Sequence, residues 1–281
     1  MTVHRSDSSV RVVRSSLVVI AAVTAVTVLV AQQPAHSQPD DPYAPFLGIW
    51  SGVFTTQENE FWGLEDFTCF PGCSLAAYEQ MIALLRDPAN DELPFGALMG
   101  MNGQFVTEQL VSILTPIGRQ IQQANTLEND PKLYCQPYGF VREVMNPLPI
   151  EITRDGDNLL IRYEEYSLLR PIYLDGRQRP QYMTPTMLGF SVGRIDGGAL
   201  IVETTGVVPD RFSDASQGGY TAALTAIERY TVHDNPRRLE LTVTLEDPIV
   251  LSEPHVMTKT WLYTPDVELV QDSCGDYPGK F

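Results

Sequence analysis

The pattern of apolar and polar residues changes twice along this chain. Residues 17–30 form an almost unbroken apolar run, residues 74–127 carry apolar side chains at helical spacing, and after Cys135 the spacing becomes two. The pattern is clearest in residues 239–245, where aliphatic side chains alternate with a glutamate and two threonines. The pattern therefore predicts a helical part followed by a long β part.

Two helical segments are expected near the N-terminus. The first begins at Ser74, a good N-cap residue, and ends at Pro88. The second spans residues 105–127, where Pro116 is expected to kink or divide the helix. Residues 93–103 are rich in Met, Gly and Pro, and we expect a loop there.

Eight later segments have the composition and alternation of short strands, and tight turn sequences such as Asp-Gly separate many of them. They are residues 149–153, 159–166, 171–174, 188–195, 199–205, 227–233, 239–246 and 256–264. An opening strand is expected within residues 45–56. Short strands with hairpin connections predict a mainly β fold, an antiparallel meander that forms either a barrel or a two-sheet sandwich.

The N-terminus has the three parts of a secretion signal. Arginines precede the apolar core of residues 17–30, and Ala35-His36-Ser37 is a small-x-small cleavage box. The core is shorter than the roughly 20 residues of a membrane-spanning helix, so we expect cleavage after the box and no membrane span in the mature protein. A retained signal anchor is the alternative.

The signal sets the expected domain organisation. Residues 1–37 are the signal peptide, residues 38–45 are a tether rich in Pro and Asp, and residues 46–281 form a single β-rich domain with a helical insertion at about 74–127. We therefore expect the protein in the periplasm or outside the cell.

The chain is acidic, with a formal net charge of −16. Such a surface repels phosphate backbones and anionic lipid head groups, so we expect neither a nucleic-acid partner nor peripheral membrane binding. A solvated acidic surface that keeps an exported protein soluble is the simplest interpretation of this charge.

The cysteines all follow the predicted signal. They are Cys69, Cys73, Cys135 and Cys274. An even number in an oxidising compartment predicts two disulfides, and we favour a local Cys69–Cys73 bridge with a long-range Cys135–Cys274 bridge, while the other two connectivities stay open. Zinc is the rival interpretation, but the spacing is poor for it.

Charged residues that interrupt apolar strands are the candidates for chemistry. Only two histidines follow the signal, so we expect no metal and no cofactor. The candidate catalytic residues are Glu164, Glu203, Glu228, Arg170 and Arg194. Such groups inside a barrel either pair with one another or act on a polar ligand. Arg194 and Glu203 flank a tight turn and are expected to form a buried pair, which leaves Glu228 as the better cavity candidate.

A ligand cavity would be walled by aromatic residues of the strands together with Glu228. These are Trp50, Tyr163, Tyr173, Tyr230 and Trp261. The leading hypothesis is an exported barrel that binds a small, partly apolar ligand. Two alternatives stay open, namely a cofactor-free lyase, isomerase or hydrolase that uses barrel carboxylates, and a structural or partner-binding envelope protein.

A joint pattern of short motifs runs through residues 135–254. The motifs are Cys135-x-Pro137-x-Gly139, Asp175-Gly176-Arg177-x-x-Pro180, Gly189-x-Ser191-x-Gly193, Leu200-x-Val202-Glu203-Thr204, Glu228-Arg229-Tyr230 and Asp247-Pro248. In this pattern the chain resembles a group of uncharacterised secreted bacterial proteins, which implies an exported β-rich domain and no established reaction. Gly48-Ile49-Trp50 is in addition similar to the first strand of lipocalin-type barrels.

Overall fold

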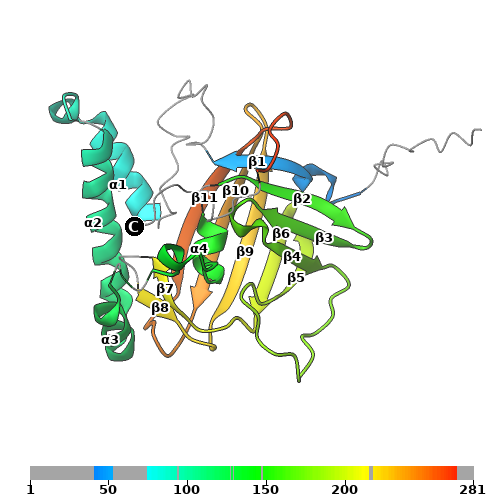
Figure 1. Cartoon of the computed structure of the whole chain (residues 1–281). Helices are drawn as coiled ribbons and strands as arrows, with labels where there is room; N and C mark the ends of the chain where they lie inside the picture. Colours follow the sequence, from blue (N-terminus) through cyan, green and yellow to red (C-terminus); the bar gives the residue numbers. More distant parts are fainter. Residues whose placement is uncertain are drawn as a thin grey trace, which may run out of the picture. The chain divides into compact units, whose positions relative to one another are not determined.

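The alternating segments of the sequence form a closed β-barrel, drawn in Figure 1. Its strands are β1 (Gly48–Gly52), β2 (Ile150–Asp155), β3 (Asn158–Tyr163), β4 (Leu169–Tyr173), β5 (Phe190–Asp196), β6 (Ala199–Thr205), β9 (Thr225–His233), β10 (Arg238–Glu246) and β11 (His255–Tyr263). Their order around the barrel is β1-β11-β10-β9-β6-β5-β4-β3-β2, and pairing of β1 with β2 closes the ring. Closure leaves no free sheet edge. The predicted barrel is confirmed, and the sandwich alternative is wrong.

The computed structural model describes residues 41–52, 75–93, 95–126, 128, 130–146, 148–214 and 218–270. These residues belong to one compact unit, Pro39–Phe281. The predicted signal peptide, residues 1–37, lies outside the described residues, as do residues 38–40 of the predicted tether, so cleavage and export stay predictions.

Each of the eight strand segments predicted from the sequence overlaps a barrel strand, but the meander is not purely antiparallel. β4 and β5 run parallel, with Ile172 opposite Ser191 and Tyr173 opposite Val192. The connection through residues 174–189 is too long for a hairpin and returns the chain to the starting end of β4. A small additional sheet of β7 (Asp210–Asp214) and β8 (Gly218–Tyr220) was not predicted.

The helical part contains α1 (Leu75–Arg86), α2 (Phe95–Ile113) and α3 (Pro116–Ala124). Pro116 divides the second predicted helix as expected, and Thr115 caps α3 because its Oγ1 accepts a hydrogen bond from the Gly118 N–H at 3.1 Å. The loop predicted for residues 93–103 is wrong, since α2 already begins at Phe95. The Leu, Met and Ala residues of that segment are strong helix formers and outweigh its glycines.

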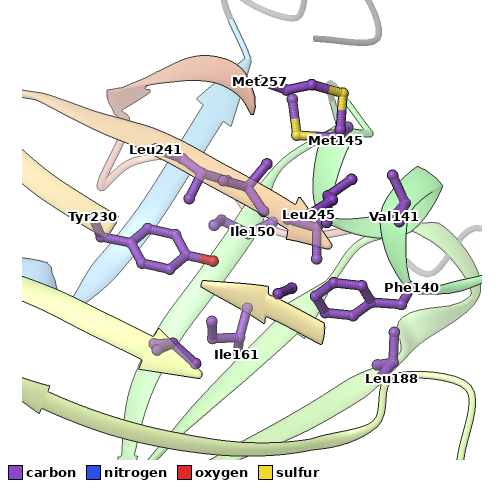
Figure 2. Packing of buried hydrophobic residues seen from close by; sticks show 14 of the residues in the cluster. Phe140, Val141, Met145, Ile150, Ile161, Leu188, Tyr230, Leu241, Leu245 and Met257 are labelled. Carbon is purple, nitrogen blue, oxygen red and sulfur yellow. The ribbon is translucent and has the colours of Figure 1, made fainter. Parts of the chain in front are cut away.

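A further helix, α4 (Phe140–Met145), was not predicted and packs into the barrel core. In Figure 2, Phe140, Val141 and Met145 point toward Leu245 of β10, and the Met145 side chain lies beside Met257. The helix therefore covers the end of the barrel at which β10 ends and β11 begins. Within the described ranges, no helix has both the length and the apolar character needed to cross a membrane.

The opposite end of the barrel is covered by the short helix η1 (Ala44–Phe46) and by Arg237. The indole Nε1 of Trp50 donates to the Phe46 carbonyl at 2.8 Å, and Arg237 donates to the Pro45 carbonyl at 2.8 Å. The Arg237 guanidinium also lies 5.6 Å from the Trp50 ring centroid, within the range of a cation–π interaction. Both ends of the barrel are therefore closed by packed elements.

The disulfide prediction falls largely on residues outside the described ranges. Cys69, Cys73 and Cys274 lie there, whereas Cys135 follows the short helix η5 (Pro131–Tyr134) and is not a free thiol. The pairing of the four cysteines therefore stays a prediction.

Candidate functional site in the barrel interior

A buried ion pair between Arg170 and Glu228 crosses the barrel interior. Arg170 lies on β4 and Glu228 on β9, with β5 and β6 between them in the sheet. The Arg170 Nη2 to Glu228 Oε1 distance is 2.5 Å, and the two side chains are 1% and 0% exposed. A charge so completely removed from water is tolerated only when it is paired and hydrogen-bonded.

The Arg170 guanidinium has used all of its hydrogen-bond donors. Its Nε donates to Ser191 Oγ at 3.0 Å. Its Nη1 donates to the Tyr163 hydroxyl at 3.2 Å and to Glu228 Oε2 at 2.8 Å. Its Nη2 donates to Thr204 Oγ1 at 2.7 Å and to Glu228 Oε1. Five N–H groups meet five acceptors, so a ligand could bind Arg170 only by displacing one of them.

Both carboxylate oxygens of Glu228 also have hydrogen-bond partners. Besides both Arg170 nitrogens, its Oε2 accepts from the Tyr230 hydroxyl at 2.7 Å, and its Oε1 accepts from Thr204 Oγ1 at 3.2 Å. Burial, reinforced by the Glu228 charge, raises the pKa of Tyr230 well above its usual value, so this hydroxyl stays protonated and donates. Arg170 and Glu228, which the sequence singled out separately, are thus one completed network that braces the barrel.

Arg194 and Glu203 are paired, as expected, but their pair is not buried. Arg194 Nη1 lies 2.5 Å from Glu203 Oε1, and the side chains are 57% and 54% exposed. The pleat explains the error: Val202 and Thr204 point into the barrel, so Glu203 between them points to solvent. The buried pair is Arg170 with Glu228 instead.

The remaining predicted site residues divide between the interior and the outside. Trp50, Tyr163, Tyr230 and Trp261 are buried in the core cluster. Tyr173 lies on the outer face, where its ring stacks on Phe190 with the centroids 5.0 Å apart. Glu164 follows β3 and accepts a hydrogen bond from the Val270 N–H at 3.0 Å. Neither Glu164 nor Tyr173 belongs to the interior, contrary to the cavity expectation.

A second cluster of charges, which the sequence reasoning missed, lies under α4. Its first member is Glu165, which is 2% exposed and begins the short helix η6 (Glu165–Ser167). Glu165 accepts hydrogen bonds from Lys132 Nζ, from the Tyr138 hydroxyl at 2.7 Å and from Asn146 Nδ2. This carboxylate therefore has partners on both oxygens.

Lys259 is the second member and points inward from β11. Its Nζ donates to the backbone carbonyls of Val144, at 3.3 Å, and Asn146, at the end of α4. The Trp261 ring centroid lies 3.9 Å from the same Nζ. Burial lowers the pKa of Lys259 well below its usual value, partly offset by the Glu143 charge. This lysine anchors α4 to the barrel wall.

Glu143 of α4 is the third member and differs from the other two. It is 1% exposed, and neither carboxyl oxygen has a hydrogen-bond partner. Burial, together with the Glu165 charge, raises the pKa of Glu143 to about 8 against the attraction of Lys259, Lys132 and Arg142. The Trp261 Nε1–H, also buried, likewise has no partner. Unsatisfied buried groups of this kind are rare in folded proteins and often mark function.

Comparisons with protein-family models, with curated proteins and with solved structures found no match to this chain. The resemblance to secreted bacterial proteins and to lipocalin-type barrels therefore stays a prediction. Within the described residues, no group of three or more His, Cys, Asp and Glu side chains is arranged to hold a metal ion.

The exchanged roles of Glu203 and Glu228 give a stability prediction. Glu228→Gln leaves the buried Arg170 charge without its counter-ion and should lower the free energy of unfolding by roughly 3–5 kcal/mol. Glu203→Gln breaks only an exposed pair and should cost less than about 1 kcal/mol. Urea unfolding of both variants measures the difference, and equal losses would contradict the assignment.

The pKa of Glu143 gives a pH prediction. The folded protein keeps a proton on Glu143 up to about pH 8, whereas the unfolded chain loses it near 4.5. The resulting stabilisation is complete below pH 4.5 and is lost by roughly 1.4 kcal/mol per pH unit as the pH rises toward 8. Urea unfolding of the wild type and of Glu143→Gln across this window measures that contribution together with its coupling to Lys259, whose pKa the Glu143 charge raises. A pH-independent difference would refute it.

Proposed function

We propose that this protein is an exported carrier that binds a small, partly apolar ligand at the α4 end of its barrel. One observation supports the proposal. In the barrel interior the Arg170–Glu228 network is fully hydrogen-bonded, whereas both carboxyl oxygens of Glu143 under α4 have no hydrogen-bond partner. A buried polar group without a partner costs about 1–3 kcal/mol. A ligand that supplies the partner recovers this free energy on binding.

The apolar residues around α4 suit the apolar part of such a ligand. Val141, Met145 and Leu245 belong to the core cluster around α4, and Met257 lies next to Met145 (Figure 2). Methionine side chains are unbranched and flexible, so they can repack around an inserted alkyl chain. The α4 end therefore combines an adaptable apolar wall with one polar group, as small-molecule sites do.

Entry of the ligand requires α4 to move, because Glu143 is only 1% exposed. The helix comprises Phe140–Met145 and is held at its C-terminal end by Lys259 through the Val144 and Asn146 carbonyls. Opening α4 exposes the buried side chains of one short helix, and ligand binding has to repay that cost. We infer that α4 is the gate of the site.

A second candidate is a cofactor-free acid–base enzyme, and one observation favours it. The Glu143 pKa of about 8 is close to neutral pH, where a carboxyl group can both give and take a proton. The general acid in that case would be Glu143 rather than Glu203 or Glu164, which lie outside the barrel interior. Turnover would then have to accompany binding at the same place.

Binding can be tested with octyl compounds that share one alkyl chain, namely 1-octanol, octanoate and octylamine. We expect saturable binding of at least one of them at a stoichiometry of one in calorimetric titrations. Met257→Phe fills the α4 end and should weaken that binding by about tenfold or more. The matched control is Val256→Phe, because Val256 is the neighbouring residue and is 39% exposed on the outer face.

Two results would contradict the proposal. Absence of binding for all three compounds would favour a bracing role for the interior charges, as in a structural envelope protein. Equal weakening by Met257→Phe and Val256→Phe would place the bound compound outside the α4 end. Circular dichroism of each variant confirms that it is folded.

A further inference from the structure

The charged groups that face Glu143 come from several elements. Glu165 precedes β4, Lys259 lies on β11, Lys132 on η5, and Arg142 on α4 itself. Tyr163 at the end of β3 also senses the Glu143 charge. The balance of these groups decides which ligand head group the site prefers.

The nearby cations are already engaged. Arg142 pairs with Asp130 through two hydrogen bonds of 2.8 and 3.1 Å, and its guanidinium lies 3.9 Å from the Tyr138 ring centroid. Lys132 pairs with Glu165. None of these cations forms a hydrogen bond with Glu143, whose oxygens have no partner.

Lys259 is also unable to serve an anionic ligand. Two of its ammonium hydrogens go to the carbonyls of Val144 and Asn146, and the Trp261 ring occupies a further side of the nitrogen. The Arg170 donors are all used within the central network. An anionic head group placed beside Glu143 would face two carboxyl groups, Glu143 and Glu165, and would gain no donor from these cations.

A cationic head group, by contrast, would gain favourable interactions with Glu143. An ammonium group brings donors and a positive charge, and Glu143 offers two free acceptor oxygens in an environment that excludes water. Charge-assisted hydrogen bonds are stronger than neutral ones, and a buried pair is screened little by salt.

We propose that Glu143 is the binding site for the protonated amine of a ligand with an apolar body, in other words that the carrier takes alkyl- or arylalkylamines. This inference rests on the proposed function and names the class of ligand. Binding then proceeds with proton balance: the Glu143 carboxyl releases its proton to the solvent, and the resulting carboxylate pairs with the ammonium, which keeps its own protons.

The test compares the same three octyl compounds by their head groups. At about pH 7 octylamine should bind at least about tenfold more tightly than 1-octanol, and octanoate should bind most weakly. Glu143→Gln should remove the preference for the amine, so that octylamine and 1-octanol bind within about twofold of each other in this variant. Glu246→Gln is the matched control, because it removes one exposed carboxylate and so tests attraction to the acidic surface alone.

Proton release is the second readout. Calorimetry of octylamine binding in buffers of different ionisation enthalpy should show release of about one proton near pH 7, which falls away above the Glu143 pKa of about 8. The release should be absent in Glu143→Gln.

The outcomes separate this inference from the proposed function. Equal or tighter binding of 1-octanol or octanoate overturns the amine assignment and leaves the carrier standing. An amine preference that survives Glu143→Gln, or that Glu246→Gln removes equally, overturns it as well. If none of the octyl compounds binds, the carrier itself is contradicted.

Discussion

The ion pair between Arg170 and Glu228 is the interaction on which the rest of the barrel depends. The seam between β4 and β5 has only a short ladder, and it is the one parallel pairing in the barrel. Arg170 spans this seam by donating to Ser191 on β5, to Thr204 on β6 and to Glu228 on β9. One guanidinium group thus ties together four strands where the backbone ladder is shortest.

This completed network also determines where function can lie. Because all Arg170 donors and both Glu228 oxygens have partners, the centre of the barrel has nothing to offer a ligand. Glu143 and Trp261, which lie outside this network, are among the buried residues with unsatisfied side-chain atoms. Phe140 connects the two regions, since its ring centroid lies 5.0 Å from the Arg170 guanidinium carbon. The rigid Arg170–Glu228 network therefore lies next to the α4 end of the barrel, where the side chains can rearrange.

Strand positions could be predicted from the sequence because the pleat imposes a spacing of two, and every predicted strand segment overlaps a barrel strand. The alternation does not show which side chains face the barrel interior where several apolar residues are consecutive. Leu200, Ile201 and Val202 are consecutive, so the sequence did not reveal that Glu203 faces outward; the pairing of Val202 with Glu228 decides this. Tertiary register, rather than local pattern, therefore separates a bracing charge from a solvated one.

Glu143 could not be found by the same reasoning, because α4 has too few residues to show a helical period and its burial depends on packing against distant strands. Lys259 did carry a signal. It shares the inward phase of its strand with Met257 and Trp261, and an inward lysine requires a partner inside the barrel. That requirement would have pointed to a second polar cluster, though not to the backbone carbonyls that meet it.

The central claim is that the barrel interior holds one fully hydrogen-bonded ion pair, Arg170–Glu228, and one protonated carboxyl group, Glu143, that has no hydrogen-bond partner. Infrared difference spectroscopy of the wild type against Glu143→Gln tests it directly, at about pH 6 and hence below the Glu143 pKa of about 8. The account predicts a carbonyl band of a protonated, weakly hydrogen-bonded carboxyl group that only the wild type shows and that disappears when octylamine binds. A wild-type spectrum with no such band, and only carboxylate absorption at this position, would contradict it.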